Sequence, residues 1–92
     1  MRTIKELLIL LREELPKRIV NDDSGSICWT LGRMENEGII TQPEFNVMDF
    51  FIDSKEPENA GYFKYDDCGG FWWPYGELAP RLEFLDKLIA EL

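Results

Sequence analysis

The residues best suited to ligand chemistry are a group of aromatic side chains and one arginine, all in the C-terminal third of the chain. Seven of the sixteen residues at positions 61–76 are aromatic. Aromatic rings are rigid, amphipathic anchors at binding sites, and they stack on nucleobases. A guanidinium can stack beside them and bind an anionic group. The predicted binding residues are Tyr62, Tyr65, Trp72, Trp73, Tyr75 and Arg81.

These residues also have a structural interpretation. Arg81 can pack on an indole and pair with Glu77 or Glu83, as arginine does in many proteins. In an extended strand, Trp72 and Trp73 point to opposite faces, so that one ring seals the core while the other stays outside. Three interpretations therefore remain open: the aromatic segment binds a protein, binds a nucleotide, or serves only the fold.

The sequence contains no catalytic signature. It has no histidine, which excludes an ordinary Ser-His or Cys-His pair. The adjacent aspartates at 22–23 and 66–67 lack the spacing of a calcium loop, and aspartate is common in turns. Two cysteines without histidine are too few ligands for a zinc site within one chain. We therefore expect a protein that is not an enzyme, with no metal and no cofactor.

The expected location is the cytoplasm of a cell. The apolar run at 7–11 is short and lies between Glu6 and Arg12, unlike a secretory signal, and no stretch approaches the length of a membrane span. In that reducing compartment Cys28 and Cys68 are expected to be free thiols.

Four helices are predicted to position these groups. Threonine and glutamate three residues apart form capping boxes at 3–6 and 41–44. The expected helices span 4–15, ended by Pro16; 25–37, ended by Gly38; 42–54; and a last one opened by Ala79 and Pro80. Their apolar stripes predict a core that contains Leu8, Leu11, Leu31, Met34, Phe45, Met48, Leu85 and Leu88.

Two short aromatic strands are predicted between the third and fourth helices. Residues 62–65 and 71–73 flank a turn at 66–70 that is rich in aspartate and glycine. The expected fold is therefore α+β, with four helices and a small β-hairpin in one domain spanning residues 1–92.

The charge is strongly acidic and unevenly distributed. The net charge is −8, with +2 in residues 1–20 and −10 in residues 21–92. Such a body repels phosphate backbones, which argues against direct nucleic-acid binding. Residues 31–45 resemble a helix-turn-helix in pattern, but the helix that would enter the groove carries Asp49 and Asp53 and has no basic residue before Lys55. The charge does suit docking on a basic protein surface.

The chain as a whole resembles small accessory proteins of tailed phages and prophages. The resemblance is carried by short motifs along nearly the full length: Gly25-Ser-Ile-Cys28, Gly38-Ile-Ile-Thr41 with Glu44, Gly61-Tyr62, Trp72-Trp73-Pro74 with Gly76, and Pro80-Arg-Leu-Glu-Phe-Leu85. It implies a non-enzymatic phage protein of the class that includes inhibitors of host defence, some of which mimic nucleic acid while others sequester nucleotide signals. It assigns no catalytic residues.

Two functions follow as expectations. The first is a phage-encoded interaction protein that binds and inhibits a host protein in the host cytoplasm, such as an antiviral defence protein of the kind that anti-CRISPR proteins block. The second is a small-molecule binder that sequesters a nucleotide immune signal through Trp72, Trp73, Tyr75 and Arg81.

A homodimer is also expected. Ile9 points away from the main apolar stripe of its helix, and the aromatic segment holds more rings than one hairpin face can bury. A symmetric contact along the first helix or across the hairpin would cover this surplus apolar surface.

Overall fold

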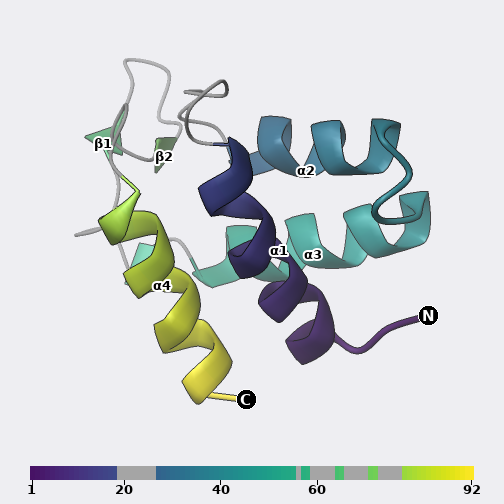
Figure 1. Cartoon of the computed structure of the whole chain (residues 1–92). Coiled ribbons are helices and arrows are strands. Elements are labelled where there is room, and N and C mark those ends of the chain that lie inside the picture. The colour runs from purple at the N-terminus through teal and green to yellow at the C-terminus, as the bar shows by residue number, and fades with distance from the viewer. Residues whose placement is uncertain (19–26, 56, 59–63, 66–70, 73–77) are drawn as a thin grey trace.

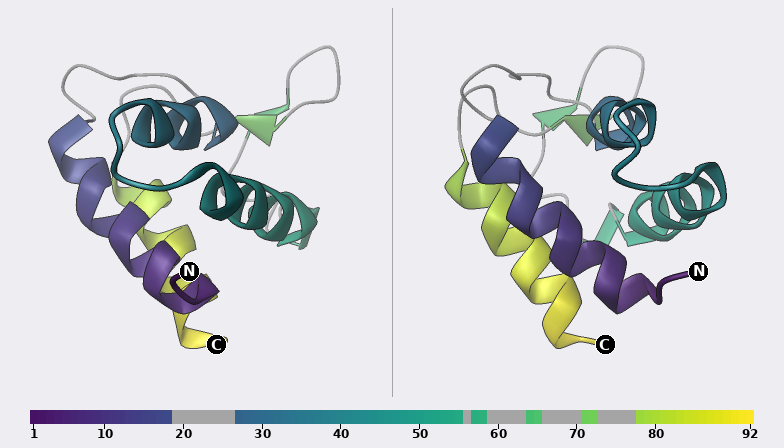
Figure 2. Two further views of the ribbon diagram at one scale, coloured as in Figure 1. Left: turned by 90° about the vertical axis from the view of Figure 1, so that its right-hand side faces the viewer. Right: turned by 45° about the vertical axis from the view of Figure 1, so that its right-hand side comes forward.

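Four α-helices make up most of the part of the chain that the structure describes (Figure 1). The computed structural model describes residues 1–18, 27–55, 57–58, 64–65, 71–72 and 78–92. The helices are α1 (Ile4–Arg18), α2 (Ile27–Asn36), α3 (Gln42–Lys55) and α4 (Ala79–Ala90). Helices α1 and α4 lie side by side as one pair, α2 and α3 form a second pair, and α1 also crosses and contacts α3 (Figure 2).

The core lies where the two helix pairs meet. Every helix contributes buried apolar side chains to it, as does the turn after α2; together these are Leu7, Leu8, Leu11, Leu15, Leu31, Met34, Ile40, Met48, Ile52, Phe84, Leu85 and Leu88. Seven of the eight predicted core residues are among them, which confirms the helical periodicity. Phe45 differs, because it is half-buried and packs against the edge of the core.

The predicted α+β class is wrong, because the described residues form an all-α fold. Strands β1 (Lys64–Tyr65) and β2 (Phe71–Trp72) do pair antiparallel at the expected place between α3 and α4. Each has only two residues, and so short a ladder supplies no sheet layer that could cover a core. The other residues of the predicted strands, 62–63 and 73, lie outside the described part of the chain.

Helix α1 continues through Pro16, so the prediction that Pro16 ends it is wrong. Proline removes one backbone hydrogen bond, and near a C-terminus that loss is confined to the last turn. Two cations at this end of the helix bind Glu14 one turn back. Lys17 Nζ lies 3.0 Å from Glu14 Oε2, and Arg18 Nη2 lies 3.4 Å from Glu14 Oε1. Positive charge also suits the C-terminal end of a helix.

The corner between α2 and α3 follows the sequence prediction closely. Gly38 has φ of +78°, the left-handed conformation that favours glycine. The Gly38 amide donates to the Glu35 carbonyl at 3.0 Å, and the Ile39 amide donates to the Met34 carbonyl at 2.9 Å. This pattern is a Schellman motif, and Ile39 packs against the core that includes Met34. The corner thereby fixes the direction in which α3 begins.

Candidate functional site

The structure places only part of the predicted aromatic binding set. Tyr65 lies in β1 opposite Phe71, and Trp72 lies in β2 opposite Lys64. Tyr62, Trp73 and Tyr75 lie outside the described residues. Whether these rings converge on a ligand therefore stays a prediction.

Arg81, the sixth member of that set, lies in the first turn of α4 and is only 1% exposed. It shares the buried side of α4 with Phe84, Leu85 and Leu88. A guanidinium in this position is packed inside the protein. Its predicted packing on an indole and its pairing with Glu77 or Glu83 stay predictions. A nucleotide that used it would have to reach a side chain that is covered in this structure.

The outer face of α3 carries the clearest described surface for a partner. Phe50 is 80% exposed, which is unusual for so large an apolar side chain. Beside it is an open apolar groove of about 400 Å³. The groove is lined by Ile4 of α1 and by Asn46, Val47, Phe50, Phe51 and Ser54 of α3. We call this surface the α3 face.

Charged side chains border the α3 face on both flanks. Helical spacing places Asp49 and Asp53 on the flank next to Phe50, and Lys55 on the flank next to Phe51. The Lys55 ammonium lies 5.7 Å from the centre of the Phe51 ring, within the range of a cation–π contact. In the described part of the chain, neither Asp49 nor Asp53 forms an ion pair. The face is thus apolar along its middle and acidic along one edge.

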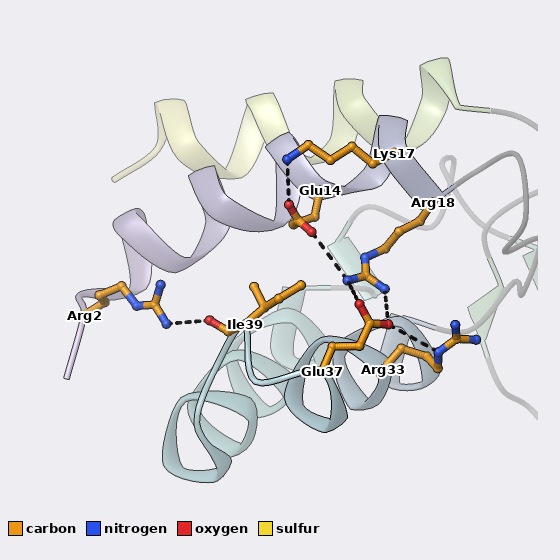
Figure 3. Close-up of polar contacts among 7 residues, drawn as sticks. All are labelled: Arg2, Glu14, Lys17, Arg18, Arg33, Glu37 and Ile39. Atoms are coloured by element: carbon orange, nitrogen blue, oxygen red, sulfur yellow. Dashed lines mark hydrogen bonds and ion pairs between the residues drawn. The ribbon is translucent and has the colours of Figure 1, made fainter.

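Helix α3 is held in place by a clamp between Arg2 and Glu44. Arg2 Nε donates to Glu44 Oε2 at 2.9 Å, and Arg2 Nη2 donates to Glu44 Oε1 at 2.8 Å. The Arg2 backbone amide adds a bond of 3.2 Å to Glu44 Oε2. The same Nη2 donates to the Ile39 carbonyl at 2.9 Å (Figure 3). The N-terminal segment is thereby fixed to the α2–α3 corner, which sets Ile4 beside the groove.

Glu44 also completes the capping box predicted for α3. The Thr41 amide donates to Glu44 Oε1 at 2.9 Å, and the Glu44 amide donates to Thr41 Oγ1 at 3.3 Å. One carboxylate, with only 4% of its side chain exposed, therefore accepts bonds from both Arg2 and Thr41. The Arg2 guanidinium first, and the Thr41 amide next, hold the pKa of Glu44 far below its ordinary value, so that it stays ionised.

A second charged network joins α1 to the end of α2 (Figure 3). Arg18 lies between Glu14 and Glu37, and its two terminal nitrogens reach Glu37 at 2.9 and 3.0 Å. Arg33 Nε approaches the same Glu37 at 3.6 Å. Hydrogen bonding to Arg18 lowers the pKa of Glu37, and the same bond raises the pKa of Arg18. This network uses its carboxylates internally, in contrast to Asp49 and Asp53.

The chemistry open to the α3 face is binding. Its lining residues are apolar or neutral, and among the described residues no three acidic or cysteine side chains gather where they could hold a metal ion. None of the described helices is long and apolar enough to cross a membrane. The arrangement suits an apolar anchor from another molecule, with a positive charge on the Asp49 side.

The α3 face was not predicted from the sequence, although the spacing of the apolar residues indicates it. Phe45, Met48 and Ile52 account for the core side of the helix predicted at 42–54. The remaining apolar residues, Val47, Phe50 and Phe51, form a second stripe on α3, of which Phe51 also packs against the core.

Comparisons with known proteins find no match among family models, curated proteins or solved structures.

Proposed function

We propose that this protein is a non-enzymatic binding protein that inhibits a host component by covering part of its surface. The single observation that supports this most is the α3 face, where Phe50 stands 80% exposed beside an open apolar groove. Isolated, exposed large aromatic side chains of this kind are typical anchors in protein interfaces. The face lies on a helix whose start is held by Arg2 and by the capping box, so that its backbone is formed before a partner arrives, which lowers the entropic cost of binding.

The acidic charge and the phage-like motifs suggest the class of target. A net charge of −8 accelerates encounter with a basic surface, including the nucleic-acid groove of another protein. Defence proteins that bind nucleic acid carry such surfaces. The proposed target is therefore a host defence protein, and the proposed location is the host cytoplasm.

The test is capture of host proteins by the immobilised protein. Two single variants are compared with the wild type. Phe50→Ser removes the exposed ring of the α3 face. Ile9→Ser removes an apolar side chain of α1 that is 38% exposed and lies outside the groove. We expect a bacterial lysate to yield a specific protein that the wild type and Ile9→Ser retain and Phe50→Ser loses.

The salt concentration is kept low enough to preserve contacts between charges. Capture of no protein under these conditions contradicts the proposed function. If a protein is captured, plaque formation on hosts that carry or lack defence systems shows whether expression of the wild type, but not of Phe50→Ser, protects the phage. Equal protection by both variants would place the inhibitory surface elsewhere.

A further inference from the structure

The shape of the α3 face limits what can occupy it. Val47, Phe50, Phe51 and Ser54 follow one another at intervals of three, one and three residues. They therefore form a straight strip along two turns of α3, about 10 Å long at 1.5 Å per residue. A second helix laid against such a strip meets it with apolar residues at the same spacing, as in helix-in-groove recognition.

The charges beside the strip select among helical partners. Asp49 and Asp53 are four residues apart, so both project along the same edge of the face. Elsewhere in the described structure, Glu37, Glu44 and Asp86 are each bound to an arginine. Burying the α3 face under a neutral partner would desolvate Asp49 and Asp53 without compensation, whereas lysine or arginine on the partner supplies the missing countercharge.

We propose that the α3 face binds a basic amphipathic helix of the partner protein, an inference that rests on the proposed function. An apolar side chain of that helix enters the groove beside Phe50, and basic residues one turn apart pair with Asp49 and Asp53. A second copy of this chain fits less well, because two bodies of −8 repel each other and symmetry brings the same carboxylates together. An anionic membrane surface is disfavoured for the same electrostatic reason.

The test uses two fluorescein-labelled synthetic peptides of one helical pattern, with leucine on the apolar side and either lysine or glutamate on the other. Binding is followed by fluorescence anisotropy at low and moderate salt. We expect the lysine peptide to bind the wild type, and its affinity to fall about tenfold or more in Phe50→Ser, since a central aromatic anchor dominates such contacts. The glutamate peptide should not bind.

A pair of double variants separates the proposed charge contacts from the general attraction of an acidic protein. The double variant Asp49→Asn with Asp53→Asn removes the two negative charges along the edge of the α3 face. Glu83→Gln with Glu91→Gln removes the same charge from two exposed positions, one in α4 and one directly after its last residue. The Asp49/Asp53 double variant should bind the lysine peptide about three- to tenfold more weakly at low salt, with a smaller loss of affinity at moderate salt. The Glu83/Glu91 double variant should change this affinity by less than about twofold.

Three results would overturn the inference. The first is equal binding of the two peptides, and the second is an equal loss of affinity in the two double variants. The third is a concentration-dependent dimer in sedimentation that Phe50→Ser abolishes, which would make a second copy the occupant. Circular dichroism of each variant verifies that its helices are intact.

The same experiments distinguish failure of this inference from failure of the proposed function. Host capture that depends on Phe50 without binding of the lysine peptide would leave the proposed function standing and refute this inference. Binding of the lysine peptide without capture of any host protein would support the inference and contradict the proposed function.

Discussion

Two glycines six residues apart should respond to alanine in opposite directions. Gly32 lies inside α2, where glycine is about 1 kcal/mol less favourable than alanine. A Cβ atom there would meet Phe45 Cε2 at 4.0 Å, an ordinary contact distance, so the methyl group fits. Gly32→Ala should therefore raise the free energy of unfolding by about 0.5–1 kcal/mol.

At Gly38, in contrast to Gly32, the backbone conformation decides the effect of an alanine. A Cβ atom built there meets nothing within 4 Å, so any effect must come from φ of +78°. The left-handed conformation costs an alanine roughly 1–2 kcal/mol, and reduced freedom of the unfolded chain returns about 0.4–1 kcal/mol. Gly38→Ala should therefore lower the free energy of unfolding by about 1 kcal/mol.

Urea denaturation of the wild type and both variants, monitored by circular dichroism, measures these changes. The free energies of unfolding of the two variants should differ by about 2 kcal/mol. In thermal denaturation the same difference would separate their melting temperatures by roughly 8–16 °C in a domain of this size. If both substitutions shift the midpoint in the same direction, the Schellman geometry at Gly38 or the helical packing at Gly32 has been assigned incorrectly.

Two further predictions concern Glu44 and the core. Since the pKa of Glu44 is lowered in the folded protein, its contribution to stability is complete above its ordinary value of 4.5 and is lost as the pH falls through the folded pKa. Glu44→Gln should therefore be less stable than the wild type at pH 7, and urea titrations should show this gap narrowing at pH 3, whereas a constant gap would refute the electrostatic explanation. Leu85→Ala should lower the free energy of unfolding by about 2–5 kcal/mol, because Leu85 is fully buried. Phe50→Ser, at an exposed position, should change it by less than about 0.5 kcal/mol in the same assay, and a larger loss would show that Phe50 packs in the core.

Local signals in the sequence predicted the helices and their ends well. The capping boxes at Thr3 and Thr41 form as expected, since each is complete within four residues. Gly38 adopts the expected left-handed turn for the same local reason. The prediction for Pro16 was wrong because the cost of a proline depends on its place in the helix, and Pro16 lies in the last turn of α1.

The fold class and the candidate site depend on information that local patterns lack. Aromatic composition predicted strands between α3 and α4, but composition does not determine how many residues of a hairpin will pair. The Arg2–Glu44 clamp joins residues 42 positions apart, so a capping glutamate gave no sign of its second partner. The exposure of Phe50 likewise follows from which side of α3 meets α1, and that orientation is set by the whole assembly.

The pairing of α1 with α4 has a consequence for synthesis on the ribosome. Arg12 and Asp86, which join the two helices, are 74 residues apart in the chain. At about 5–20 residues per second, roughly 4–15 s pass between their incorporation. During that interval Leu8 and Leu11 have no α4 against which to pack, while α2 and α3 can already close their corner. The nascent chain therefore carries a leucine-rich helix whose packing surface stays incomplete until α4 has been synthesised.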